Sequence, residues 1–140
     1  MTPFTLEILT PEKPFYRGDC ESLVIPTGDG MMGIQANHIP LTAAIHDGIV
    51  SFTVPGGERR LCAVERGMVA VAGNRARILC ESAVSPDEID EEAERRALLE
   101  AEAAMREKNS KEEYMRYQLT LAKTFNRLKA KQSAAEDQIR

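Results

Sequence analysis

The chain has 140 residues, a formal net charge of −4 and three cysteines, Cys20, Cys62 and Cys80. An acidic balance argues against nonspecific binding of nucleic acid, so no nucleic-acid partner is expected. No apolar run approaches the ~20 residues that cross a bilayer, and no signal segment is recognisable, so we expect a soluble or peripherally attached protein without direct membrane insertion. An odd number of cysteines without CxxC spacing predicts buried, unpaired thiols and a reducing compartment.

The first predicted strand covers residues 4–9, where Phe4, Leu6 and Ile8 alternate with polar residues. Pro11 and Pro14 are expected to end it. Residues 21–25 predict the next strand, closed by Pro26 and a turn over residues 27–30.

Two hairpins are predicted after that. Residues 49–54 and 60–64 flank a glycine-containing loop, and residues 68–71 and 75–80 flank a turn at Gly73-Asn74. Short strands with frequent turn signals predict an all-β sandwich or barrel over residues 1–85.

The composition changes at Ser85-Pro86. All nine glycines and all seven prolines lie at or before Pro86, so the remainder can form uninterrupted helices. Residues 86–140 are therefore predicted to form a second, α-helical domain, an antiparallel two-helix hairpin. Ser85 and Pro86 are the predicted hinge between the two domains.

Capping patterns predict where the two helices begin. Ser85 is expected to cap the first, with Pro86 in its first turn and Glu88 completing a capping box. A second capping box at Ser110, directly after Asn109, places the connection at residues 108–110.

The predicted inner edges of the two helices differ in size. The first is small and the second is bulky, which permits close packing but buries little area. The first edge comprises Ile89, Ala93, Ala97, Ala101 and Met105, and the second comprises Tyr114, Tyr117, Leu121, Phe125 and Leu128.

Charge is segregated between the helices. Nine acidic residues lie between Asp87 and Glu107, whereas Arg116, Lys123, Arg127, Lys129 and Lys131 form a basic run. This run is either an ordinary solvated helix surface or a surface for an acidic partner.

No catalytic motif is recognisable. His38 and His46 have no zinc-ligand spacing, and the GxSxG, HExxH and P-loop patterns are absent. The glycines at Gly28, Gly30 and Gly33 do not open a helix and predict a turn rather than a phosphate site. We expect no metal ion and no resident cofactor.

Several segments together resemble the epsilon subunit of bacterial F-type ATP synthases. They are residues 6–12, residues 23–26, the Gly30–Ile34 stretch, the His38-Ile39-Pro40-Leu41 stretch and residues 125–128. The likeness extends over the β part, the Ser/Pro junction and the helical hairpin. It implies a non-catalytic rotor subunit on the cytoplasmic face of the bacterial inner membrane.

The resemblance also implies partners. The β-sandwich would join the gamma subunit to the c-subunit ring. The loops expected to face the c ring comprise Gly28, Asp29, Gly30, Met31, Met32, Gly33, Ile34, His38, Ile39, Pro40, Leu41 and Thr42. The helical hairpin would move between a compact and an extended form, and its basic residues would meet the alpha and beta subunits of the catalytic head and oppose ATP hydrolysis.

Some relatives bind ATP through an [IL]-D-x-x-R-A motif at the start of the first helix. Here Ile89 and Asp90 match, but Ala93-Glu94 replaces Arg-Ala, and the arginines are shifted to Arg95 and Arg96. Arg116 is the remaining candidate on the second helix. ATP as a regulatory ligand, in a free-standing ATP-sensing protein of the same fold, is the alternative function. A small hydrolase using His38 or His46 is a third.

Overall fold

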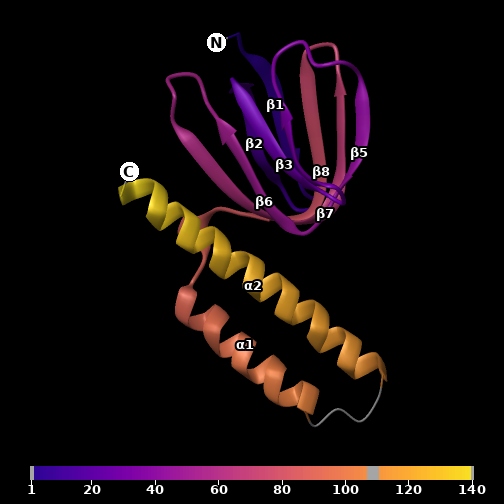
Figure 1. Cartoon of the computed structure of the whole chain (residues 1–140), viewed down its shortest axis with the longest axis vertical. Coiled ribbons are helices and arrows are strands. Elements are labelled where there is room, and N and C mark those ends of the chain that lie inside the picture. Colours follow the sequence, from indigo (N-terminus) through magenta and orange to yellow (C-terminus); the bar gives the residue numbers. More distant parts are fainter. Residues whose placement is uncertain (1, 107–110, 140) are drawn as a thin grey trace. The chain divides into compact units, whose positions relative to one another are not determined.

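A computed structural model describes residues 2–106 and 111–139 of the chain. Within these residues, eight strands are followed by a short 3-10 turn and two α-helices (Figure 1). The strands are β1 (Phe4–Leu9), β2 (Pro14–Cys20), β3 (Ser22–Thr27), β4 (Gly30–Ile34), β5 (Leu41–Ile45), β6 (Gly48–Thr53), β7 (Arg59–Ala72) and β8 (Arg75–Val84). The helical elements are the 3-10 turn η1 (Pro86–Glu88), α1 (Glu91–Arg106) and α2 (Lys111–Ile139).

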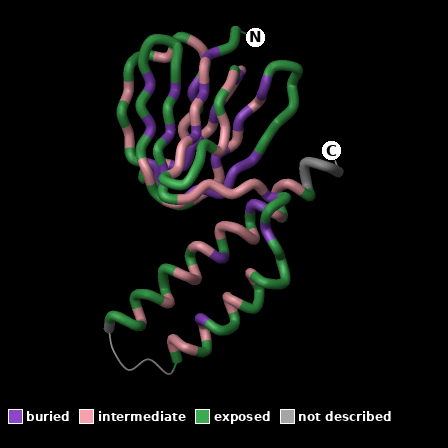
Figure 2. The backbone as a smooth tube through the Cα atoms, turned by 180° about the vertical axis from the view of Figure 1, so that it is seen from behind, coloured by how far each residue is buried: buried purple, intermediate pink, exposed green. Residues whose placement is uncertain are grey.

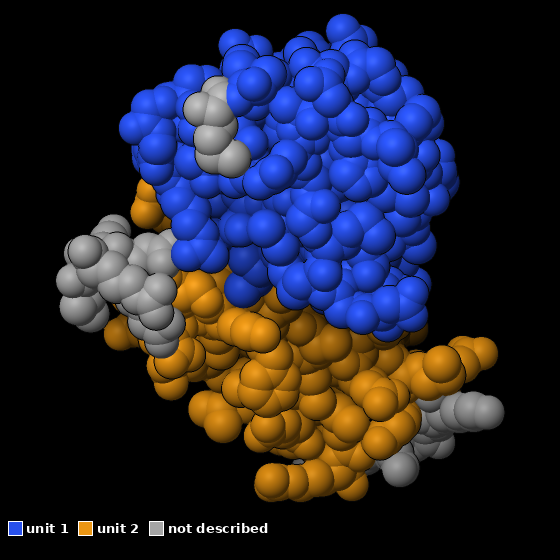
Figure 3. All heavy atoms as spheres, turned by 45° about the horizontal axis from the view of Figure 1, so that its top comes forward, with its two compact units in different colours: residues 1–85 blue, residues 86–140 orange. Residues whose placement is uncertain are grey.

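The chain forms two compact units, residues 1–85 and 86–140, which Figure 3 draws in separate colours. Unit 1 contains the strands, and unit 2 contains η1, α1 and α2. The predicted fold class, a β-sandwich followed by an antiparallel helical hairpin, is confirmed.

The hydrophobic core of unit 1 comes from alternate residues of its strands. Phe4, Leu6 and Ile8 of β1 are buried, and their neighbours are half-buried. Figure 2 shows the same alternation of buried and less buried positions along several strands. The three cysteines are buried and form no disulfide with one another, as predicted.

The β7 strand is longer than the sequence predicts. Residues 60–64 and 68–71, expected as two strands, belong to one. Its first half pairs with β6 and its second half, from Gly67, pairs with β5. One edge of β7 is therefore hydrogen-bonded to two different strands in succession. This change of partner lets the eight-stranded sheet fold over itself into a sandwich.

Gly67 marks the change of partner. A Cβ atom at this position would lie 1.9 Å from the carbonyl oxygen of Leu79 and 2.7 Å from the Cα atom of Cys80. Only a residue without a side chain permits β7 and β8 to approach so closely.

Three further differences from the predicted strands concern short segments. Strands β2 and β5 were not predicted, and Met31 and Met32 lie in strand β4 rather than in a loop. Pro26 lies within β3 instead of ending it. Strands β2, β3 and β4 contain glycine, proline or charged residues, and β5 contains two alanines, so the local patterns of these segments are weak strand signals.

The start of the first α-helix also differs from the prediction. Residues 86–88 form a 3-10 turn, and α1 begins at Glu91 with Asp90 as its cap. The backbone N–H of Ala93 donates to the Asp90 carboxylate at 3.1 Å. The proposed capping box at Ser110 and the connection at residues 108–110 lie outside the described residues.

We expect Asp90→Ala to lower the stability of the hairpin by about 1 kcal/mol, because the cap of α1 is lost. Asp90→Asn should retain most of that stability, since an amide oxygen caps equally well. Thermal unfolding followed by circular dichroism at 222 nm checks both. Glu92→Ala, which removes the same charge at an exposed position two residues away, is the matched control.

The observed inner edges of the two helices differ from the predicted edges at two positions. Ala93 is exposed, and Leu98 is half-buried beside the buried Ala101. A strict four-residue repeat drifts by about 40° per step, which turns Ala93 away from the later members. On α2, Thr124 is buried where Phe125 was expected, and Phe125 is 56% exposed.

Candidate protein-interaction surfaces

An apolar row crosses the outer face of unit 1. Leu9 of β1 is the cross-strand partner of Leu79 in β8, Leu79 is the partner of Met68 in β7, and Met68 is the partner of Ala44 in β5. We call Leu9, Leu79, Met68 and Ala44 the apolar row. Four strands that are separate in the sequence thus supply one continuous stripe.

The alternation of the strands turns this row outward. Val69 and Ile78, the neighbours of Met68 and Leu79, are fully buried in the core. Met68 and Leu79 are each 52% exposed. Large apolar side chains gathered on one exposed face of a domain indicate a surface that another protein covers.

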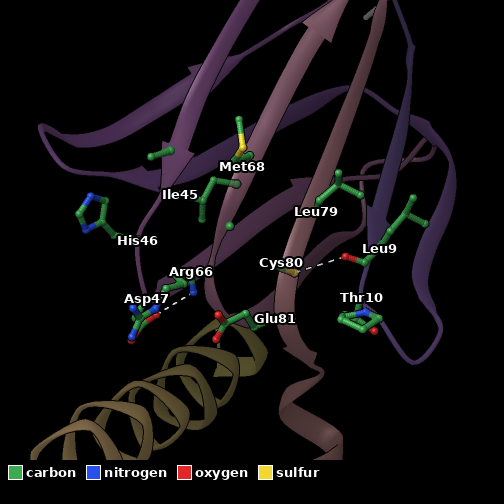
Figure 4. A pocket seen from close by; sticks show the side chains of 13 residues that line it. Leu9, Thr10, Ile45, His46, Asp47, Arg66, Met68, Leu79, Cys80 and Glu81 are labelled. Carbon is green, nitrogen blue, oxygen red and sulfur yellow. Dashed lines mark hydrogen bonds between the residues drawn. The ribbon is translucent and has the colours of Figure 1, made fainter. Parts of the chain in front are cut away.

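The apolar row forms the floor of an open groove with a volume of about 930 Å³ (Figure 4). Polar residues stand at one end of the groove. There the backbone N–H of Arg66 donates to the Asp47 carboxylate at 2.7 Å, and His46 and Glu81 also line the groove. An apolar floor with a polar rim is the anatomy of a protein interface.

Cys80 also lines the groove, yet its thiol is unsuited to chemistry. The thiol contacts the Leu9 carbonyl at 3.7 Å. Burial, followed by the negative charge of Glu65, raises the pKa of Cys80 to about 11. Burial likewise raises the pKa of Cys20 to about 11. At neutral pH both thiols are protonated and poorly nucleophilic.

The residues predicted to face the c ring differ in accessibility. Met31 is 62% exposed and Ile39 is 75% exposed, so both can contact a partner. Ile34 is only 1% exposed, and Met32 and Leu41 pack against the core. The remaining members lie in the 28–29 turn, along the exposed parts of β4 and β5, or in the segment between those strands: Gly28, Asp29, Gly30, Gly33, His38, Pro40 and Thr42.

The structure places these residues at two ends of unit 1. The turn before β4 lies beside His46, because a Cβ atom on Gly28 would lie 3.1 Å from the His46 Nε2 atom. The segment after β4 lies beside the β7–β8 turn, where the N–H of Asn37 donates to the Asn74 side chain at 2.8 Å. Strands β4 and β5 run between these ends, and a five-residue strand is about 17 Å long.

The five basic residues of α2 divide into two groups. At about 100° per residue, Arg116, Lys123, Arg127 and Lys131 lie within about 80° of one another, whereas Lys129 lies on another side. Arg127 Nη1 is 3.1 Å from the Glu94 carboxylate, and Lys131 Nζ donates to the Pro86 carbonyl at 3.1 Å. Arg116 and Lys129 are exposed.

The candidate nucleotide residues do not come together. Ile89 is buried, Asp90 caps α1, and Arg95 pairs with Glu91 at 2.7 Å, while Arg96 is exposed. The Glu94–Arg127 pair sets the register of the antiparallel helices and places Arg116 level with Met105. Fifteen residues of helix, about 22 Å, separate that level from Asp90.

The two histidines are also apart, since His38 precedes β5 and His46 follows it. Among the described residues, no group of three or more His, Cys, Asp or Glu side chains is arranged to hold a metal ion. No helix in the part of the chain that the structure describes is both long and apolar enough to span a membrane.

Sequence reasoning did not find the apolar row. Met68 and Leu79 were assigned to a predicted hairpin. Their local pattern does not tell whether such an apolar side chain lies in the core or is exposed at an interface. The available signal was the run of adjacent apolar residues within these strands, 68–72 in β7 and 78–80 in β8, which leaves large apolar side chains on both faces.

The comparisons with known proteins agree on one family. The family described as ATP synthase, Delta/Epsilon chain, beta-sandwich domain, matches residues 3–86. The ATP synthase epsilon chain of Caldicellulosiruptor bescii is 35% identical over 137 residues, which are 98% of this chain and 99% of the relative. That of Persephonella marina is 37% identical over 107 residues, 76% of this chain and 79% of the relative.

A solved structure shares the fold. A chain of the Euglena gracilis mitochondrial ATP synthase, from a structure of its OSCP/F1/c-ring in rotational state 1, superposes with a TM-score of 0.80 at 21% identity. The match covers 96% of this chain and 82% of the Euglena chain.

Proposed function

This chain belongs to the ATP synthase delta/epsilon chain family, and we propose that it joins the gamma subunit of the rotor to the c-subunit ring. Within that family it is a non-catalytic subunit of the central stalk. The complex is membrane-associated, and we place this chain on the cytoplasmic face of the bacterial inner membrane, held there by its partner subunits.

The apolar row is the observation that carries the proposal. A subunit clamped to a shaft needs a large, rigid and apolar contact surface. The row supplies it on four paired strands, whose backbone cannot rearrange without breaking the sheet. We therefore assign the groove floored by Leu9, Leu79, Met68 and Ala44 to the gamma subunit.

The c ring would meet one end of unit 1. Met31 and Ile39 are the exposed apolar side chains of the two candidate ends. Because methionine adapts to irregular surfaces, the β3–β4 hairpin suits a contact that must tolerate a ring of repeated subunits.

The helical hairpin would regulate the catalytic head. The basic residues Arg116, Lys123, Arg127, Lys129 and Lys131 suit acidic surfaces of the alpha and beta subunits, and α2 is 29 residues long. A helix of that length extends about 43 Å, enough to reach along a shaft. The hinge at Ser85 and Pro86 would permit this movement.

Two measurements test the proposal. The full-length chain should co-purify with its cognate gamma subunit and c ring, and failure to form a stable complex with gamma would end the rotor assignment. In the assembled enzyme, truncation after Ser85 should preserve this assembly and raise ATP hydrolysis at low proton-motive force. Equal hydrolysis rates would remove the inhibitory role and leave the coupling role intact.

A further inference from the structure

A charged row lies beside the apolar row, one step closer to the β7–β8 turn. Glu7 of β1 is the cross-strand partner of Arg17 in β2 and of Arg77 in β8. We call Arg17, Glu7 and Arg77 the arginine row. Alternate residues of a strand point to the same face and are about 7 Å apart. Arg77 therefore shares the outer face with Leu79 of the apolar row, two residues further along β8.

Glu7 holds the two arginines. Its Oε2 atom is 3.4 Å from Arg17 Nε, and Arg77 Nη2 donates to its Oε1 atom at 3.2 Å. The Glu7 side chain is only 15% exposed, whereas the side chains of Arg17 and Arg77 are 63% and 47% exposed. The carboxylate is thus covered, and the two guanidinium groups remain accessible to a partner.

The arginine row has an excess of positive charge, because two guanidinium groups share one carboxylate. A guanidinium group has several N–H donors, so the bond from Arg77 to Glu7 leaves donors for a second carboxylate. One row further out, the exposed residues Asp19 and Arg75 carry opposite charges and offset each other. The unbalanced positive charge therefore lies directly beside the apolar row.

The opposite border of the apolar row has the opposite sign. The charged residues that line the groove there are Asp47, Arg66 and Glu81, two acids and one base. A partner with complementary charges can lie across such a surface in only one orientation, because the reverse orientation places like charges together. The two borders thus supply direction, which the apolar row alone does not.

We propose that Arg77 is a specificity-determining residue of the gamma contact, and that it binds a carboxylate of the gamma segment whose apolar side chains lie along the apolar row. The four strands beneath that row span about 14 Å, and the carboxylate would lie about 7 Å to one side of it. Arg17, held by the same Glu7, reinforces the positive charge. The choice of gamma as the partner rests on the proposed function.

The surroundings of Arg77 fit a protein carboxylate better than a nucleic-acid phosphate. A phosphate backbone is bound by several cations along its path. Here Glu7 offsets one of the two arginines, and the neighbours of Arg77 on the same face include Leu79 and Ala70. A single charge contact beside apolar side chains is typical of the rim of a protein interface.

Titration calorimetry of the full-length chain with its cognate gamma subunit tests the contact. At about 50 mM potassium chloride, Arg77→Gln should weaken binding about tenfold, and the loss of affinity between about 50 and 300 mM salt should be smaller than for the parent. Arg77→Glu should weaken binding about a hundredfold, because it places two carboxylates together. Both variants should melt close to the parent, since exposed ion pairs contribute little to stability.

Arg60→Gln is the matched control for the loss of charge. Arg60 is 46% exposed and forms an ion pair of the same kind, with Glu58 at 3.4 Å. It lies in the half of β7 that pairs with β6, whereas the apolar row uses the half that pairs with β5. Its replacement should change neither the affinity for gamma nor the salt dependence.

Charge exchange identifies the carboxylate on the partner. One acidic residue of gamma, when replaced by arginine, should bring the affinity of Arg77→Glu to within about tenfold of the parent and should not rescue Leu79→Glu. Parent-like affinity and salt dependence of Arg77→Gln, or no rescue by any acidic position of gamma, would overturn the carboxylate contact. Weak binding of Leu79→Glu would then still assign the groove to gamma. A parent chain that does not bind gamma would end the proposed function and this inference with it.

Discussion

Replacing Gly67 by alanine is expected to destabilise unit 1 by more than about 3 kcal/mol. The new Cβ atom would lie 1.9 Å from the Leu79 carbonyl oxygen, which is backbone and cannot rotate away. The β7–β8 ladder would have to separate where β7 changes partner from β6 to β5. For a unit of this size the melting temperature should fall by at least about 12 °C.

Gly33→Ala is the matched control for this prediction. A Cβ atom at Gly33 meets nothing within 4 Å, so the substitution should change the free energy of unfolding by less than about 0.5 kcal/mol. Urea unfolding of each variant, followed by circular dichroism in the β-sheet region, measures both. A Gly67→Ala midpoint equal to that of the parent would show that the two strands can move apart at little cost.

Leu79→Glu is expected to weaken binding to the gamma subunit by about 30-fold to 100-fold. The substitution places a carboxylate in the centre of the apolar row, where binding would strip it of water without a partner. Met68→Glu should have a similar effect, because Met68 and Leu79 are cross-strand partners. The fold should survive, since both side chains point away from the core.

Ala72→Glu provides the comparison for these groove variants. It adds the same charge on β7, the strand of Met68, at an exposed position outside the groove, opposite Arg75. Titration calorimetry with the cognate gamma subunit should give an unchanged affinity for this variant. Parent-like affinity of both Leu79→Glu and Met68→Glu would exclude the groove as the gamma-binding surface.

Local patterns predicted much of unit 1. Alternation identified β1 to the residue, and the Gly73-Asn74 turn identified the β7–β8 hairpin. Asn74 and Gly73 both adopt positive φ angles, as a two-residue hairpin turn with the twist of its strands requires. These features depend on neighbours in the sequence, which is why they can be recognised there.

The start of α1 could not be predicted from local patterns alone, because the sequence offers two candidate capping residues. Ser85 and Asp90 both precede helical residues, and both are good capping residues. The structure closes the first turn as η1 and caps α1 with Asp90. The interaction of the Pro86 carbonyl with Lys131, which is 45 residues away, helps to hold that turn, and no local pattern contains it.

The candidate sites depended still more on tertiary structure. The segments from Gly28 to Ile34 and from His38 to Thr42 are adjacent in sequence and were expected on one surface. Of their exposed apolar residues, Met31 lies near the start of β4, whereas Ile39 lies in the segment that follows the end of β4. Two residues that are close in the sequence can lie at opposite ends of a domain when a strand runs between them.

By itself, the sequence determined the fold class, the family and the change of composition at Pro86. These follow from local periodicity, from turn residues and from short motifs that need no knowledge of distant contacts. Only the tertiary structure decided which residues meet. Strand register assembled the apolar row from four separate strands, and the packing of α2 on α1 bound Arg127 to Glu94. Each local pattern is compatible with several strand registers. The register is selected when the side chains of all the strands pack together in one core, so it depends on residues that are distant in the sequence.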